Sequence, residues 1–217
     1  MSYHEPSLRV LALDVISYGC QDLMDYEREL LPQIHQLWPG LACLFHHQEK
    51  FVVIKAMQTL LALTNLSGDF IRSRVMKEVV PGVVQYMEKQ GNISSESRSA
   101  YLHTTNYKLQ LCVLSTLGPL AKNLALDGND LNTLVNICLP YLSDLQPLPL
   151  QNAAVESFSM FIDLDPDALW YTLCEVYCPV MLTPPGSEFL SISFPYGPNK
   201  QNRFSTKITE IFNEHFL

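Results

Sequence analysis

Residues 30–38 read LLPQIHQLW, and this stretch decides the fold. Its apolar residues Leu31, Ile34 and Trp38 are three and four positions apart. That spacing places the side chains on one face of an α-helix. A proline, Pro32, nevertheless stands near the start of the run. The stretches EVVPGVVQYM, ICLPYL and VYCPVML repeat this combination, so a helical pattern that contains a proline recurs along the chain.

Helical periodicity extends outward from this stretch in pairs of segments. Turn signals separate the two segments of a pair, as at Ser67-Gly68 and Asp127-Gly128. We find no run with the alternation of apolar and polar residues that is typical of a β-strand. We therefore predict an all-α protein whose helical hairpins cover approximately residues 6–47, 48–91, 104–145 and 146–185.

The second helix of each predicted hairpin carries a proline, at intervals of 49, 59 and 39 residues, namely Pro32, Pro81, Pro140 and Pro179. Their mean interval is slightly above the period of about 40 to 47 residues that is typical of HEAT repeats. The longest interval contains QGNISSESRSAYLHTT, residues 90–105, which we interpret as an inserted mobile loop. The pattern predicts an α-solenoid of about four HEAT-like helical hairpins.

The recurring prolines also predict the shape of the second helices. An internal proline has no N–H and frees the carbonyl four residues earlier, which bends the helix. The freed carbonyls belong to polar residues and are expected on the solvent side, at Arg28, Lys77, Asn136 and Glu175. We expect the same bend in each second helix. At Pro32, a proline in the first helical turn is the alternative.

Residues 186–217 are predicted to form an extended connector and a terminal helix. Proline, glycine and serine are frequent in the connector. Phe204, Ile208, Ile211 and Phe212 then fall near one face of a short helix. Because repeat arrays need covered ends, we expect a C-terminal capping helix on the last hairpin. Presentation of its apolar face to another chain is the alternative.

Composition excludes several classes of partner and location. The 217 residues include 14 basic and 22 acidic ones, with a net charge of -8 and no long basic run, so we expect no nucleic acid and no anionic membrane as a partner. We find no uninterrupted apolar run of about 18 to 20 residues and no secretion signal. The cysteines lie mostly in apolar helical patterns, which is typical of reduced thiols in a cytoplasmic protein: Cys20, Cys43, Cys112, Cys138, Cys174 and Cys178.

The stretch DLDPDALW, residues 163–170, resembles the start of a calcium loop. Such a loop needs a glycine at its sixth position and a carboxylate at its twelfth, where this chain has Ala168 and Cys174. We therefore interpret Asp165 as the cap of a helix that Pro166 begins.

Other chemical candidates are weaker. Cys43, His46 and His47 lie close together, but no second ligand pair follows at a suitable spacing, so we predict no metal site and expect Cys43 to pack. Cys174 and Cys178 would share a helix face, where buried packing is the expected role. We find no nucleophile elbow, phosphate loop, kinase signature or His-Glu metal motif. We therefore predict no enzyme activity, no catalytic residues and no cofactor.

One basic cluster is the candidate partner-binding site. FIRSRVMKE places Arg72, Arg74 and Lys77 just after the Ser67-Gly68 turn, and it is the most basic part of an acidic chain. An acidic protein would be its natural partner. The alternative is an ordinary solvated helix face, which is the commoner role of such residues.

Four segments in order carry a resemblance to a known family: GDFIRSRVMKEVVP, YKLQLCVLSTLGPLA, DLNTLVNICLPYLSDLQPLPLQNAA and DPDALWYTLCEVYCPVMLTPP. The chain resembles the C-terminal region of the Tti-one family. These Tel-Two-interacting proteins are HEAT-repeat subunits of the Triple-T (TTT) co-chaperone complex. The resemblance extends from about residue 8 to Pro185 and includes Trp170, which we expect in the core between repeats.

The resemblance implies a non-catalytic protein-binding scaffold. Its partners would be the other TTT subunits, Tel-Two and the second Tti protein. Through them, the scaffold would reach the chaperone machinery and the phosphatidylinositol-3-kinase-related kinases, which include TOR and the DNA-damage kinases. It implies a location in the cytoplasm and also in the nucleus. A generic HEAT-repeat adaptor for transport or complex assembly is the alternative.

Overall fold

The computed structural model describes residues 5–96, 99–178 and 202–216, and within these ranges every regular element is a helix. The α-helices are α1 (Pro6–Asp22), α2 (Glu27–Leu44), α3 (Lys50–Arg74), α4 (Val80–Glu96), α5 (Thr105–Asn123), α6 (Gly128–Cys138), α7 (Leu148–Ile162), α8 (Pro166–Val176) and α9 (Ser205–His215). The prediction of an all-α fold is confirmed.

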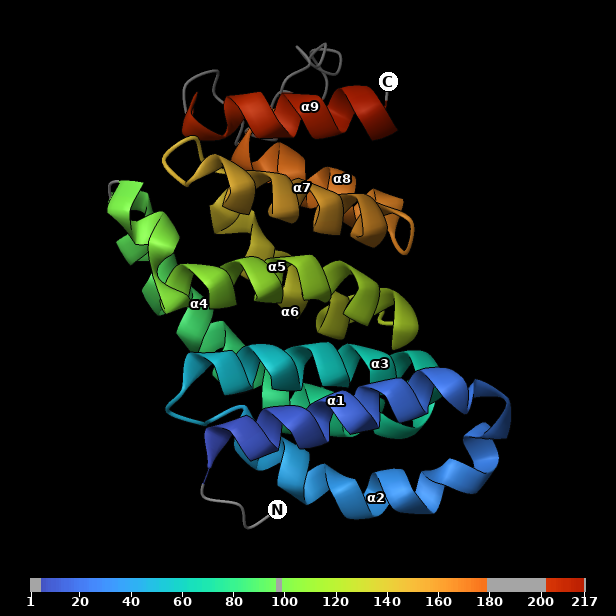
Figure 1. The fold of residues 1–217 in the computed structure, drawn as a ribbon. Coiled ribbons are helices and arrows are strands. Elements are labelled where there is room, and N and C mark those ends of the chain that lie inside the picture. Colours follow the sequence, from blue (N-terminus) through green and yellow to red (C-terminus); the bar gives the residue numbers. More distant parts are fainter. Residues whose placement is uncertain (1–4, 97–98, 179–201, 217) are drawn as a thin grey trace.

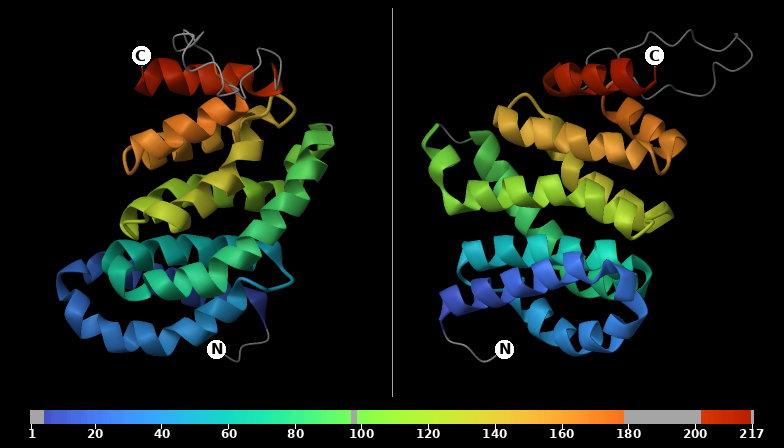
Figure 2. Two further views of the ribbon diagram at one scale, coloured as in Figure 1. Left: turned by 180° about the vertical axis from the view of Figure 1, so that it is seen from behind. Right: turned by 45° about the vertical axis from the view of Figure 1, so that its right-hand side comes forward.

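The helices form two layers. In the first layer α1 packs on α3, α3 on α5, α5 on α7 and α7 on α9, so these helices lie one above another (Figure 1). The second layer contains α2, α4, α6 and α8, and α4 is steeply inclined to the rest of the stack (Figure 2). This arrangement confirms the predicted α-solenoid. Its core is a continuous column of buried side chains that runs from Leu13 of α1 to Phe212 of α9.

A kink in the long helical stretch from Lys50 to Glu96 separates the first layer from the second. Ser67 has φ −152° and ψ 58°, outside the helical region, at the place where the sequence predicts a turn. The next residue, Gly68, lies so close to the end of α5 that a Cβ there would overlap the Asn123 carbonyl. Only glycine therefore allows the kink to pack against α5.

The four recurring prolines do not share one setting, which corrects the prediction of a common bend. Pro32 lies inside α2 as expected. Pro140 instead lies in a 3₁₀ turn, Leu139–Leu142, that follows the end of α6. An internal proline also occurs in a first-layer helix, at Pro119 of α5. Pro179 lies outside the described residues.

Pro81 follows a third kind of segment, the π-helical turn Val75–Val79. In this turn the Val80 N–H donates to the Val75 carbonyl, one residue further back than in an α-helix. Because Pro81 has no N–H to donate, the change in bonding pattern just before it lets the chain continue into α4 without a break.

The Ser-rich stretch 90–105 is largely helical, so the prediction of an inserted mobile loop is wrong for its described residues. α4 continues to Glu96, and a 3₁₀ segment covers Ser99–His103. Ser94 is fully buried, and Tyr101 is only 9% exposed. The prediction failed because this stretch has the polar composition of a loop, whereas Ser94 and Tyr101 form hydrogen bonds with buried partners.

α9 covers the last hairpin as predicted. Phe204, Ile208, Ile211 and Phe212 are buried beneath it, and α9 packs on α7. Lys207 also points inward, where its ammonium group donates to Asn152 of α7 over 3.0 Å. The predicted extended connector before α9 lies outside the described residues up to residue 201.

Local chemistry at α8 agrees with the sequence in one respect. The Asp165 carboxylate accepts a hydrogen bond from the Ala168 N–H over 3.1 Å, and Pro166 begins the helix. The helix cap interpretation of DLDPDALW is confirmed.

Cys43 of α2 is exposed, so the expectation that its side chain packs in the core is wrong.

The two tryptophans have opposite environments. Trp38 is 4% exposed, and its indole N–H donates to the Glu78 carboxylate over 2.8 Å. Trp170, which the sequence placed in the core, is 36% exposed on α8. The buried face of α8 includes Leu169, the residue before Trp170. The tryptophan therefore lies beside that face and not on it.

One described helical stretch, Lys50–Glu96, is long and apolar enough to cross a membrane by length and composition alone. Within its most apolar window, 56% is buried inside the fold. The stretch is kinked at Ser67 and packs against α1, α2 and α5. Its apolar side chains are thus used in packing between helices.

The contrast between the tryptophans gives a stability prediction. Trp38→Ala should lower the free energy of unfolding by about 3–5 kcal/mol, because it empties a buried site and leaves Glu78 without its donor. Trp170→Ala should cost less than about half as much, because its ring is already partly in water. Urea unfolding followed by circular dichroism measures both. Equal losses would contradict the two environments.

Candidate protein-binding groove

The predicted basic cluster is divided between two faces of the stack. The Arg72 guanidinium binds the Asp127 carboxylate over 2.5 Å and the Asp130 carboxylate over 3.4 Å, both at the start of α6. It also donates to the Ala125 carbonyl over 3.0 Å. The hydrogen bond to Asp127 raises the pKa of Arg72. Arg72 therefore joins α3 to α6 within the chain.

Arg74 and Lys77 have different surroundings. Arg74 lies 2.7 Å from Nδ1 of His35 in α2 and near the Phe70 ring, at 5.4 Å from its centroid. Lys77 is exposed, and its side chain makes no hydrogen bond or ion pair within the described ranges. Residues two apart on a helix point about 200° apart, so Arg72 and Arg74 cannot share a face. Of the three predicted residues, Lys77 has the most freely available charge.

A groove runs between α4 and α6 on the second-layer side of the stack. It consists of two adjoining hollows, with volumes of about 490 and 690 Å³, that share Val84 and Thr133. Arg72 and Lys77 line the second hollow, whereas Arg74 lines neither. The groove thus brings together two of the three predicted residues.

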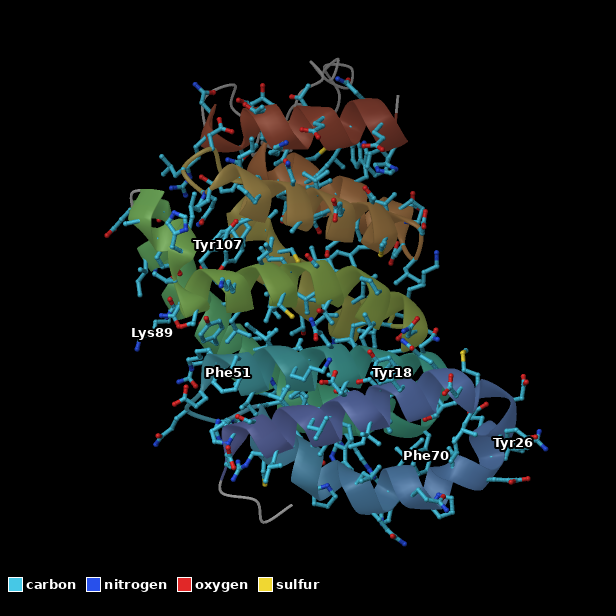
Figure 3. All side chains as sticks on the ribbon, in the orientation of Figure 1. Tyr18, Tyr26, Phe51, Phe70, Lys89 and Tyr107 are labelled. Atoms are coloured by element: carbon cyan, nitrogen blue, oxygen red, sulfur yellow. The ribbon has the colours of Figure 1, made fainter. Side chains whose placement is uncertain are left out.

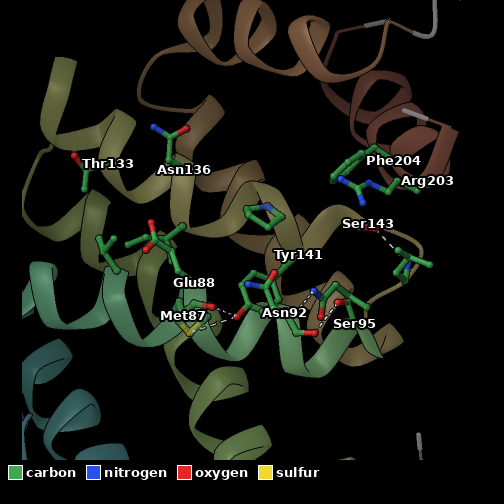
Figure 4. Close-up of a pocket in the computed structure, with 16 residues that line it drawn as sticks. Met87, Glu88, Asn92, Ser95, Thr133, Asn136, Tyr141, Ser143, Arg203 and Phe204 are labelled. Carbon is green, nitrogen blue, oxygen red and sulfur yellow. Dashed lines mark hydrogen bonds between the residues drawn. The ribbon is translucent and has the colours of Figure 1, made fainter. Parts of the chain in front are cut away.

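The first hollow is shown in Figure 4. Thr133 and Asn136 of α6 lie on one side, and Glu88 and Asn92 of α4 lie on the other. Arg203, just before α9, closes one end. Charges of both signs are present along the groove, together with amides, hydroxyls and apolar side chains. This lining suits a segment of protein better than a polyanion, which needs a continuous basic track.

The floor of the first hollow is held by a buried hydrogen-bond network. The Tyr141 hydroxyl, from the 3₁₀ turn after α6, donates to the Met87 carbonyl of α4 over 2.9 Å. Gln110 of α5 donates to the same hydroxyl oxygen over 2.9 Å. Three helical segments therefore meet at one phenol group.

Further members join α4 to Gln146, which follows the 3₁₀ turn, and join α5 to the 3₁₀ segment Ser99–His103. Ser94 donates to the Gln146 side-chain oxygen over 2.5 Å, and the Gln146 amide donates to the Gly91 carbonyl over 2.9 Å. The Tyr101 hydroxyl donates to the Gln110 oxygen over 2.5 Å. Buried polar groups with satisfied partners fix one arrangement of the elements that carry them. The network thus sets the position of the C-terminal half of α4, and with it one wall of the groove.

Three buried side chains near the groove and in α8 have raised pKa values. Burial raises the pKa of the Tyr141 phenol and of the Cys138 thiol beneath the groove. Burial, together with the neighbouring Cys178, also raises the pKa of Cys174 in α8. A raised pKa keeps these groups neutral, whereas nucleophilic catalysis by cysteine needs a lowered one. Among the residues that the structure describes, no three His, Cys, Asp or Glu side chains are grouped to hold a metal ion.

Comparison with known proteins identifies the family of this chain. The model of the TTI1 C-terminal TPR domain matches residues 1–170. The chain belongs to this family. TPR repeats have a period of about 34 residues. The first helices of the hairpins in this chain start at Pro6, Lys50, Thr105 and Leu148, which are 43 to 55 residues apart and closer to the HEAT period.

Two curated relatives cover nearly all of the chain. The human TELO2-interacting protein 1 homolog is 37% identical over 207 residues, which are 95% of this chain and 19% of the relative. The mouse TELO2-interacting protein 1 homolog is 36% identical over 205 residues, which are 94% of this chain and 19% of the relative. The chain thus spans about a fifth of the length of these relatives. No solved structure matches it.

Charge reversal at two groove residues should distinguish a residue that stabilises the fold, Arg72, from one whose charge is available to a partner, Lys77. Arg72→Glu places a third carboxylate beside Asp127 and Asp130, so we expect the melting temperature to fall by several degrees. Lys77→Glu should leave the melting temperature nearly unchanged, because Lys77 has no such contact. Differential scanning calorimetry of both variants at low salt tests the assignment. An unchanged Arg72→Glu protein would remove Arg72 from the α3–α6 contact.

The Tyr141 network predicts a pH dependence. The folded-state pKa of Tyr141 is raised above its ordinary value of about 10, so the folded chain retains a proton that the unfolded chain releases. The contribution of Tyr141 to stability is therefore complete below pH 10 and is lost as the pH rises above it. Tyr141→Phe should cost about 1–3 kcal/mol at pH 7.

Urea unfolding between pH 8 and 11 checks this prediction. Tyr141→Phe should reduce the slope of stability against pH at the alkaline end. Tyr171→Phe is the matched control, because Tyr171 is 56% exposed. Identical alkaline slopes in the wild type and Tyr141→Phe would show that the buried phenol does not control this range.

Proposed function

We propose that this chain is a non-catalytic protein-binding scaffold, part of a subunit of the TTT co-chaperone complex. Membership in the TTI1 C-terminal family, over residues 1–170, is the observation that carries the proposal. The names of the curated relatives describe proteins that interact with TELO2. We therefore propose a TELO2-type protein as a partner, and the resemblance to TTT subunits adds the second Tti protein.

The α4–α6 groove is the proposed contact surface. It is open along one side of the stack, and its lining combines apolar and polar side chains with charges of both signs. Its wall is fixed before binding by the Tyr141 network. A preformed surface avoids part of the entropy cost that a flexible one would incur on association.

The proposed role in kinase maturation follows from the proposed membership in the TTT complex. A TTT subunit helps chaperones to mature phosphatidylinositol-3-kinase-related kinases, including TOR and the DNA-damage kinases. The chain contributes binding surface to this process and no chemical step. We place its work in the cytoplasm and in the nucleus, where these clients act.

A pair of variants on α6 tests the groove. Thr133→Arg introduces a long charged side chain where the two hollows meet. We expect it to weaken capture of the purified TELO2-type and second Tti proteins by about tenfold or more, which corresponds to about 1.4 kcal/mol. Asn132→Arg is the matched control, because Asn132 is exposed on the same helix and lines neither hollow.

Binding is measured by biolayer interferometry with the 217-residue chain immobilised, and thermal unfolding verifies that both variants fold. Cells in which Thr133→Arg replaces the wild type should also contain less TOR-type kinase. Equal capture by both variants would exclude the groove as the contact surface. Failure of the wild type to bind either protein would contradict the proposed function and favour a generic HEAT-repeat adaptor.

A further inference from the structure

Basic residues are absent from a long part of the sequence. Residues 123–199 contain nine acidic residues and no lysine, arginine or histidine. The rest of the chain contains 13 acidic residues and all 14 lysines and arginines. The net charge of -8 therefore arises from this segment, which has no cation of its own to neutralise its carboxylates.

Most of the described carboxylates in this segment have a partner inside the fold. Five accept a hydrogen bond or pair with a cation: Asp127, Asp130, Asp144, Asp163 and Asp165. The side chains of Glu156 on α7 and of Asp167 and Glu175 on α8 are exposed and make no hydrogen bond or ion pair within the described ranges. Two of these three unpaired carboxylates thus lie on one short helix.

The position of Glu175 brings no benefit to α8 itself. Asp167 is in the first turn, where the positive end of the helix dipole favours a carboxylate. Glu175 is in the last turn, where the dipole disfavours a negative charge, and this turn has no basic residue. Helix stability therefore accounts for Asp167 and not for Glu175.

Two large aromatic side chains are exposed beside these carboxylates. Trp170 is 36% exposed and Tyr171 is 56% exposed. Asp167, Tyr171 and Glu175 are four residues apart, so they align along one side of the helix. Trp170 lies next to them, three residues after Asp167. We call these four residues the α8 face (Asp167, Trp170, Tyr171 and Glu175).

Other aromatic rings of this chain are already in contact with its own cations. The Arg74 guanidinium lies 5.4 Å from the centroid of the Phe70 ring (Figure 3). The same kind of contact joins Lys50 to Tyr86 and Arg203 to Phe204. Within the described part of the chain, no cation lies over Trp170 or Tyr171. The α8 face therefore has both rings and carboxylates available to a cation from outside.

We propose that the α8 face binds an arginine-containing segment of another protein. Charge complementarity selects this partner, because the face carries two unpaired carboxylates within a segment that has no basic residue. A guanidinium can pair with a carboxylate and also stack on an aromatic ring, so one arginine can use both features. Tryptophan and tyrosine are also among the residues that contribute most to protein interfaces. The α8 face is a second interaction surface, separate from the α4–α6 groove.

The spacing along α8 indicates the form of the bound segment. Asp167 and Glu175 are eight residues apart, which is about 12 Å along the helix axis. In an extended segment, side chains four positions apart point to the same side and are separated by about 13 Å. Arginines at alternate positions can therefore reach Asp167, the Tyr171 ring and Glu175 in turn.

The probe is a synthetic peptide with three arginines at alternate positions, separated by serines. It is titrated into the ¹⁵N-labelled 217-residue chain, and the two indole N–H signals are followed by NMR. The Trp170 signal should shift and saturate, whereas that of Trp38, which is buried and bonded to Glu78, should stay in place.

Two variants separate the contributions of charge and ring. Asp167→Asn/Glu175→Gln should weaken binding of the peptide by about fivefold, because it removes two ion pairs. Tyr171→Leu should weaken it by about threefold, because it removes the ring and keeps an apolar side chain. Asp25→Asn/Glu29→Gln is the matched control, since it removes the same two charges from exposed positions at the start of α2, and it should bind as the wild type does.

Circular dichroism melting verifies that every variant folds. An unshifted Trp170 signal would overturn the proposal, as would equal binding by the wild type and either α8 variant. Spermine that binds as tightly as the peptide would also overturn it, because the face would then attract any polycation. The test contains no TTT protein, so its failure is distinguishable from failure of the proposed function.

Discussion

Each first-layer helix inside this solenoid has to pack on two neighbours at once, and the rest of the structure depends on this constraint. The α5–α7 contact shows how close the packing is. A Cβ at Gly118 would lie 2.9 Å from the Met160 sulfur and 3.0 Å from the Ser157 Cα. The Gly118 N–H donates to the Ser157 hydroxyl, which donates to the Leu114 carbonyl. Small side chains with local hydrogen bonds thus let two helix backbones approach without leaving polar groups unpaired.

Because the first layer is used for packing, binding surface is left mainly on the second layer and at the ends. The inclination of α4 is the feature that opens the second layer. Tyr141 and Gln146, from the segment that follows α6, hold the C-terminal half of α4, so the hollow between the two helices is part of the folded state. The buried network is therefore a structural element and also determines the shape of the candidate interface.

The helix pairs could be predicted from sequence because their apolar residues repeat at helical spacing. Ser67-Gly68 and Asp165 were interpreted correctly because their signals are local, a turn pair and a helix cap. The sequence predicts a mobile loop at Ser94 and Tyr101. The structure differs because their partners, Gln146 and Gln110, are contributed by other segments of the fold. Composition cannot show that a polar side chain has found a buried partner.

The candidate site was only partly accessible from the sequence, for a similar reason. The separation of Arg72 from Arg74 could have been found, because two residues on a helix point in opposite directions. The pairing of Arg72 with Asp127 and Asp130 could not, because it depends on how α6 packs beside α3. The exposure of Trp170 was missed because a large aromatic residue within an apolar run favours a core position, whereas the buried face of α8 is centred on Leu169 and Leu173.

The groove and the α8 face use different physical means of recognition, so they can act independently. The α8 face presents carboxylates and aromatic rings on one exposed helix, which favours a short cationic segment and a contact that weakens as salt is added. The groove combines polar, apolar and charged side chains on a preformed wall, which is more typical of contacts between separate subunits. Its charges of both signs can also select among partners, because a misplaced like charge costs affinity. A chain built in this way can be held in a complex through its groove while a second protein occupies α8.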